Sequence, residues 1–103
     1  MGIQNVKGYD LYLINVNRYT EKSYKKYKNI INPNNLQRSR GKYHLDHKFS
    51  KTEGFKNNIS PEIIGSYINL QMLTESDNCS KCYKCSISKE ELLSEYNRKI
   101  KSF

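Results

Sequence analysis

Residues 43–47, with the sequence YHLDH, place a carboxylate directly beside an imidazole, with a second imidazole two residues before the carboxylate. Metal-dependent hydrolysis of a phosphodiester needs a hard oxygen ligand for the metal and a neutral nitrogen base near the attacking water. Asp46 and His47 are residue types that meet these two needs. Neighbouring residues on a strand point to opposite faces, but a distorted or twisted hairpin can still aim both side chains into one cleft.

A second group of residues follows further along the chain. Asn69 and Leu70 open the sequence NLQML, and Asn78 and Lys81 come shortly after it. The ordered set HxDH, NLxxL, N and K resembles the HNH endonucleases, also called ββα-metal or His-Me finger nucleases, of the small phage and mobile-element type. The resemblance runs over residues 43–84, and the order of its motifs is more specific than a bare Asp-His pair.

The resemblance implies an α+β fold. In this family a strand ends in Asp-His, a loop follows, a second strand carries Asn-Leu, and a short helix presents a His or an Asn. These parts are expected at residues 44–47, in a loop insert over 48–68, at 69–73 and in a helix that starts near Glu75. We expect a single domain over residues 1–103, with the hairpin and its helix flanked by N-terminal and C-terminal helices.

The resemblance also implies roles for individual side chains. Asp46 and Asn78 would hold a divalent cation, Mg²⁺ or Mn²⁺, which needs few protein ligands because it keeps several waters. His47 would be the general base that activates water. Asn69, placed with the catalytic residues, would tie the strand to the loop and keep the histidine oriented. Two further residues have possible auxiliary roles. His44 could be a ligand or contact the substrate, and Lys81 could contact a phosphate. Each could instead be an ordinary structural or solvent-exposed side chain.

The charge balance favours a polyanionic partner. Lys and Arg number 18 against 10 Asp and Glu, a net charge of +8. Such an excess suits nucleic acid or an anionic membrane surface. The basic residues around the hairpin are predicted to follow the phosphate backbone of DNA: Arg38, Arg40, Lys42 and Lys48.

The sequence predicts a cytoplasmic protein that does not span a membrane. It has no apolar run near the roughly 20 residues that a membrane span needs. The N-terminus shows no basic segment followed by an apolar one, which a signal peptide would have.

Three cysteines, Cys79, Cys82 and Cys85, are spaced as CxxCxxC. An odd number without a distant partner makes a poor disulfide framework. A structural zinc site usually takes four protein ligands, and no second CxxC pair is available. We therefore expect no structural zinc, and the cysteines are interpreted as ordinary packed side chains, with zinc and redox chemistry as alternatives.

The flanking segments carry helix signals. Apolar residues over 9–19 follow a helical stripe, although a strand buried on both faces also fits. Thr20 is predicted to cap a second helical segment over 21–29. Ser60 followed by Pro61 predicts the start of a short helix. A capping box predicts a further helix that ends near residue 99; it is formed by Ser88 and Glu91.

These observations favour a metal-dependent DNA endonuclease, acting as a monomer or a homodimer. Two alternatives stay open: a nucleic-acid-binding module that has lost activity, and a regulatory or structural phage protein. One ββα site cuts one strand, so a double-strand break would need a dimer or two visits.

Overall fold

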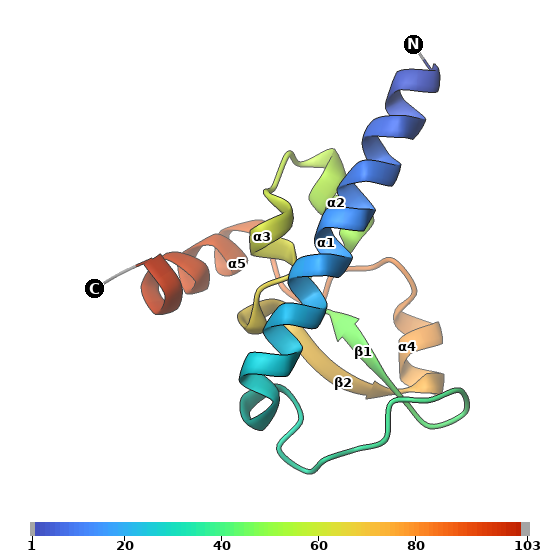
Figure 1. Cartoon of the computed structure of the whole chain (residues 1–103), viewed down its shortest axis with the longest axis vertical. Coiled ribbons are helices and arrows are strands. Elements are labelled where there is room, and N and C mark those ends of the chain that lie inside the picture. The colour runs from blue at the N-terminus through green and yellow to red at the C-terminus, as the bar shows by residue number, and fades with distance from the viewer. Residues whose placement is uncertain (1, 102–103) are drawn as a thin grey trace.

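The computed structural model describes the backbone of residues 2–101 and the side chains of residues 8–100. The fold is α+β, as the sequence predicts: helices surround a two-stranded antiparallel sheet. Figure 1 shows α1 lying across the hairpin, with α4 on one side of it and α5 on the other. The elements in chain order are α1 (Gly2–Ile31), β1 (Tyr43–His47), α2 (Lys51–Lys56), α3 (Pro61–Ile64), the 3₁₀ turn η1 (Tyr67–Asn69), β2 (Leu70–Thr74), α4 (Glu75–Lys81), α5 (Lys89–Tyr96) and the π-helical turn η2 (Asn97–Lys101).

The hairpin strands and the helix after them lie where the sequence predicts them, within one residue. β1 pairs with β2 so that Asp46 faces Gln71 and His47 faces Leu70. The insert between the strands is not a plain loop, because it contains α2 and α3. The predicted start of α3 is confirmed, since the Ser60 side chain accepts a hydrogen bond from the Glu62 amide.

α1 is one helix where two were expected. The helical interpretation of residues 9–19 is confirmed, but the predicted cap at Thr20 is wrong. The Thr20 hydroxyl donates to the Val16 carbonyl one turn earlier, at 2.7 Å, so it is satisfied inside a continuous helix. The helical geometry deviates only later, at Tyr27, with φ −116° and ψ 28°.

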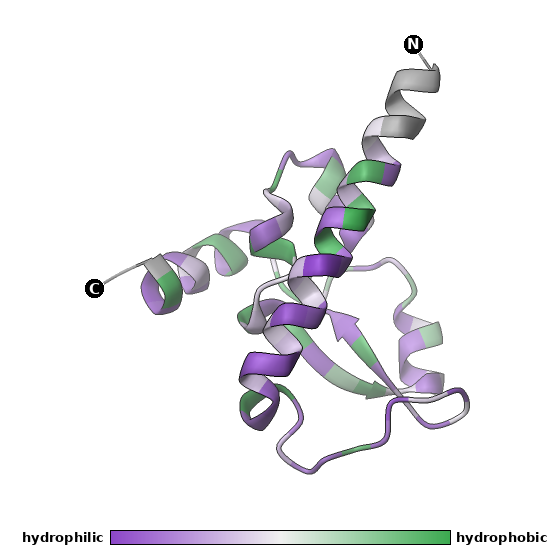
Figure 2. Cartoon of the chain, in the orientation of Figure 1, coloured by the Kyte–Doolittle hydropathy of each residue, from purple (hydrophilic) through white to green (hydrophobic). Residues whose placement is uncertain are grey.

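The core lies between the middle of α1, α3 and α5. Val16, Ile64 and Leu92 are fully buried there. Hydrophobic residues recur along α1 between hydrophilic ones, as Figure 2 shows. Gly65 permits close contact with α1, because a Cβ at this position would lie 2.7 Å from the Tyr19 Cβ and 2.9 Å from the Val16 carbonyl oxygen. This close approach fixes the middle of α1 against the rest of the fold.

Tyrosines attach the first half of α1 to the insert. The Tyr12 hydroxyl donates to the Ile59 carbonyl at 2.6 Å, and the Tyr9 hydroxyl lies 2.9 Å from the Thr52 hydroxyl. Both tyrosine rings pack edge-on against Phe55, with centroids 5.0 and 5.3 Å apart. Burial, with a smaller contribution from Tyr9, raises the pKa of Tyr12 to about 12.

The C-terminal helix begins at the predicted capping box. The Ser88 side chain accepts from the Glu91 amide, and the Glu91 side chain accepts from the Ser88 amide. α5 ends at Tyr96, earlier than expected, and continues as the turn η2. Within residues 2–101, none of the helices combines the length and the apolar character that a membrane crossing requires.

Candidate active site

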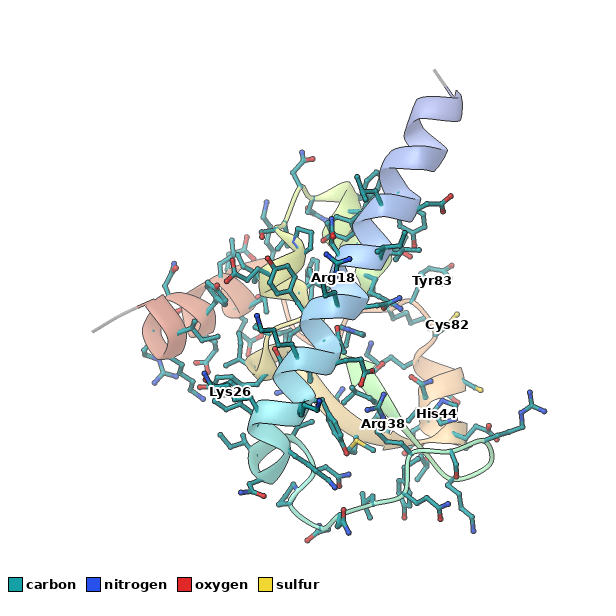
Figure 3. All side chains as sticks on the ribbon, in the orientation of Figure 1. Arg18, Lys26, Arg38, His44, Cys82 and Tyr83 are labelled. Carbon is teal, nitrogen blue, oxygen red and sulfur yellow. The ribbon has the colours of Figure 1, made fainter. Side chains whose placement is uncertain are left out.

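A cleft of about 440 Å³ brings together predicted site residues from β1 and α4. Asp46 and His47 end β1, and both line this cleft although they are neighbours on a strand. Asn78 and Lys81 reach it from α4. Figure 3 shows Cys82 and Tyr83 on the segment that follows α4. The other lining residues are Tyr9, Leu13, Leu45, Ser50, Lys51, Thr52, Cys82 and Tyr83.

Asp46 is the one charged residue that is buried in the described part of the chain, with 6% of its surface exposed. Its Oδ2 accepts a hydrogen bond from Gln71 Nε2 at 2.9 Å, and its Oδ1 lies 3.4 Å from Lys81 Nζ. A buried carboxylate needs such partners, because an uncompensated buried charge is strongly destabilising. Gln71 was not among the predicted site residues, although its place opposite Asp46 follows from the hairpin register.

Lys81 holds its ammonium group inside the cleft. Its side chain is 12% exposed, and Nζ donates to the His47 carbonyl at 2.8 Å as well as contacting Asp46. Lys81, which the sequence predicts as an auxiliary residue, is therefore the cation that balances the buried carboxylate of Asp46. A metal ion bound to the Asp46 carboxylate would compete with this ammonium group.

His47 is half-buried, and its Nε2 lies 2.9 Å from the hydroxyl of Thr20 on α1. Burial is the largest cause that lowers the pKa of His47 from 6.5 to about 3. The nearby positive charges of Lys51 and Lys81 lower this pKa further, whereas Glu21 acts in the opposite direction. The ring is therefore neutral at neutral pH, the form that a general base requires.

His44 lies outside the cleft and contacts Asn78. The Asn78 amide nitrogen lies 3.2 Å from His44 Nδ1. On the other side of the ring, His44 Nε2 is buried and lies 3.4 Å from Glu75 Oε2, without a hydrogen bond. When the Asn78 nitrogen donates to His44, the amide oxygen is left free for another ligand. His44 thus positions the amide that the sequence predicts as a metal ligand.

Asn69 also lies outside the cleft, and it is fully buried. Its side chain accepts from the Phe49 amide at 2.8 Å and donates to the Phe49 carbonyl at 3.1 Å. It donates as well to the Ile64 carbonyl at 2.8 Å. These bonds tie the segment after β1 to the segment before β2, as the sequence predicts. Any effect of Asn69 on catalysis would pass through the position of β1.

The four basic residues predicted to contact DNA do not share one hollow. Arg38 and Arg40 line a second hollow of about 420 Å³, which also includes His44. Lys48 lines a separate hollow of about 270 Å³. Lys42 is exposed next to β1. Figure 3 shows Arg38 near the hairpin.

Arg38 is already paired within the protein. Its guanidinium donates two hydrogen bonds to the Glu21 carboxylate, at 2.9 and 3.2 Å, and lies 4.5 Å from the centre of the Tyr24 ring. This pairing holds the pKa of Glu21 below its usual value. Much of the Arg38 charge is therefore already balanced within the protein.

The cysteines do not converge on one point. Cys79 and Cys82 are exposed, whereas Cys85 is half-buried and accepts a hydrogen bond from the Ser50 amide at 3.2 Å. In the part of the chain that the structure describes, no group of three or more His, Cys, Asp or Glu side chains could hold a metal ion. A magnesium site that relies on one carboxylate, one amide and water falls outside that criterion.

Comparisons with protein-family models, with curated proteins and with solved structures found no match for this chain. The cleft carries the chemistry of the candidate site. A buried carboxylate, a neutral imidazole, an amide and an ammonium group meet there from a hairpin and the helix that follows it.

Proposed function

We propose that the protein is a metal-dependent DNA endonuclease of the HNH type. The observation that supports this most strongly is the convergence of Asp46, His47, Asn78 and Lys81 on one cleft, from segments about thirty residues apart. The α+β arrangement, with the helix α4 following the second strand, agrees with the resemblance of residues 43–84 to that family.

The donor set of the cleft fits a hard divalent cation such as Mg²⁺ or Mn²⁺. Asp46 provides a buried carboxylate that requires a positive partner, and Asn78 provides a free amide oxygen. Two protein ligands leave positions for water and for phosphate oxygens of the substrate. When bound, the cation would stabilise the negative charge that develops on the phosphate and on the leaving oxygen.

His47 accepts a proton from the attacking water in this proposal. The water oxygen forms a bond to phosphorus, and the bond from phosphorus to the 3′ oxygen breaks. The leaving 3′ oxygen takes a proton from solvent water, so the products are a 5′-phosphate and a 3′-hydroxyl. Lys81, once released from Asp46, contacts a phosphate oxygen of the DNA. The lowered pKa of His47 keeps the imidazole in the neutral form, which can accept a proton, across the physiological range.

A catalytically inactive DNA-binding module is the second candidate, and one contact favours it. Lys81 neutralises Asp46 within the protein itself, so the carboxylate has a partner even without a metal. Under this alternative, the net charge of +8 would produce salt-dependent DNA binding without cleavage.

Incubation with supercoiled plasmid separates the two candidates. The endonuclease proposal predicts conversion of supercoiled to nicked circles with Mg²⁺, and none with EDTA. The double variant Asp46→Asn with His47→Gln, purified in parallel, is the control for a contaminating nuclease. Equal nicking by this variant, or a mobility shift without nicking by the wild type, would contradict the proposal.

A further inference from the structure

The Thr20 side chain makes two contacts that together determine where a proton lies. Thr20 is 4% exposed and belongs to α1, outside the hairpin and its helix. Its hydroxyl oxygen lies 2.7 Å from the Val16 carbonyl oxygen and 2.9 Å from His47 Nε2. Both distances are within hydrogen-bond range.

A hydroxyl group has one hydrogen, and a carbonyl oxygen can only accept. At 2.7 Å, the Thr20 hydrogen must lie between its oxygen and the Val16 carbonyl, since otherwise two oxygen lone pairs would face each other. The Thr20 oxygen can then only accept from the histidine ring. His47 Nε2 must therefore carry a hydrogen, and in the neutral ring Nδ1 carries the lone pair.

The other ring nitrogen is available for chemistry. His47 lines the cleft, and its Nδ1 has no hydrogen-bond partner among the described side chains and backbone. Among the described residues, the buried side-chain nitrogen that lacks a hydrogen-bond partner is His44 Nε2. Neither ring nitrogen of His47 is both buried and without a partner. His47 Nδ1 is thus left as the ring nitrogen that can accept a proton at the cleft.

We propose that Thr20 is a positioning residue that fixes His47 in the Nε2–H tautomer and makes Nδ1 the atom that accepts the proton. This inference rests on the proposed function of His47 as a base. When Nδ1 takes a proton from water, Nε2–H stays hydrogen-bonded to Thr20. The proton transfer therefore requires no change in the hydrogen bonds of the ring. α1 thereby belongs to the active site, and the contact of Gly65 with Val16 and Tyr19 helps to place it.

Two substitutions distinguish the hydroxyl from the shape of the side chain. Thr20→Val keeps the branched shape and removes the hydroxyl, whereas Thr20→Ser keeps the hydroxyl. Tyr12→Phe is a matched control, because it removes another hydroxyl that attaches α1 to the insert, through Ile59, without contacting His47. A purely structural role would give Thr20→Val and Tyr12→Phe similar effects.

The tautomer can be measured without any cleavage activity. The chain has 2 histidines, so long-range ¹H–¹⁵N spectra of labelled protein in EDTA at neutral pH contain two imidazole rings, and His47→Gln identifies one of them. We expect a protonated Nε2 and an unprotonated Nδ1 for His47 in the wild type and in Thr20→Ser. Thr20→Val should show a mixture of tautomers. An Nδ1–H ring in the wild type would overturn the inference, even if every variant were too unstable to study.

The cleavage rates complete the test. Thr20→Val should cleave DNA about 10- to 100-fold more slowly, by analogy with the loss caused by removing the hydrogen-bond partner of a metal-bound histidine. Thr20→Ser should recover most of the rate, and Tyr12→Phe should stay near wild type. A wild type that cleaves, with Thr20→Val as fast as Tyr12→Phe, would refute the role of Thr20. A wild type that does not cleave would refute the proposed nuclease, while the spectra would still report the tautomer.

Discussion

Replacing Lys81 by methionine should weaken the fold and strengthen metal binding at the same time. The substitution keeps an unbranched side chain one atom shorter than that of lysine, and it removes the ammonium group that lies 3.4 Å from Asp46 Oδ1. Asp46 is 6% exposed and would retain Gln71 as its hydrogen-bond partner. Removal of one member of a buried ion pair costs about 3–5 kcal/mol. Because Gln71 remains, we expect a loss of unfolding free energy at the lower end of this range, about 3 kcal/mol.

The metal should reverse much of that loss. In the wild type, a divalent cation must displace the Lys81 ammonium group before it binds the carboxylate, and in the variant it does not. If displacement costs about 1.4 kcal/mol or more, the affinity for Mg²⁺ should rise at least about tenfold. Urea unfolding in EDTA and in Mg²⁺, with isothermal titration, measures both effects. Lys84→Met, at an exposed position in the following segment, is the matched control. Metal affinity that is unchanged or weaker in Lys81→Met would refute the idea that lysine and metal compete for Asp46.

Three further predictions follow from the same contacts. Asp46→Ala and Asn78→Ala should each weaken Mg²⁺ binding in a calorimetric titration, Asp46 more because it carries the charge, and unchanged affinity in both would place the ligands elsewhere. In EDTA, the unfolding free energy should fall as the pH drops from about 6.5 towards 3, because His47 is protonated in the unfolded state and not in the folded state. His47→Gln should remove a slope of up to about 1.4 kcal/mol per pH unit from the plot of unfolding free energy against pH. An unaltered slope would contradict the neutral buried imidazole. In salt-dependent DNA binding, Arg40→Ala should reduce the slope of log K against log salt by about 0.9, and Arg38→Ala by less, because Glu21 already neutralises Arg38; equal reductions would show that the Arg38 pair opens on DNA.

Local chemistry explains which elements were predictable. Ser60 with Pro61, and Ser88 with Glu91, define helix starts through side chains that bind their own neighbouring backbone, so the sequence contains the whole interaction. The hairpin follows from the order of its motifs. A twisted hairpin was expected to aim Asp46 and His47 into one cleft, and both residues do line one cleft.

Contacts between distant segments explain what the sequence did not predict. Threonine is a residue type that often caps helices, but the Thr20 hydroxyl bonds to the Val16 carbonyl within the helix and to His47, 27 residues away. The pairing of Arg38 with Glu21 spans 17 residues and a turn. Lys48 follows His47 directly in the sequence, yet it lines a different hollow from the cleft residues.

The most direct test of the account is the single-turnover rate of DNA cleavage by His47→Gln compared with the wild type, in Mg²⁺ and at saturating enzyme. Glutamine keeps a donor that can reach the Thr20 hydroxyl, but it cannot take a proton from water at neutral pH. Unfolding curves and DNA mobility shifts measured in parallel should match the wild type at neutral pH. We predict a rate about 100- to 10,000-fold lower, the loss expected on removal of a general base. Cleavage at the wild-type rate by His47→Gln would contradict the assignment of this cleft as the active site.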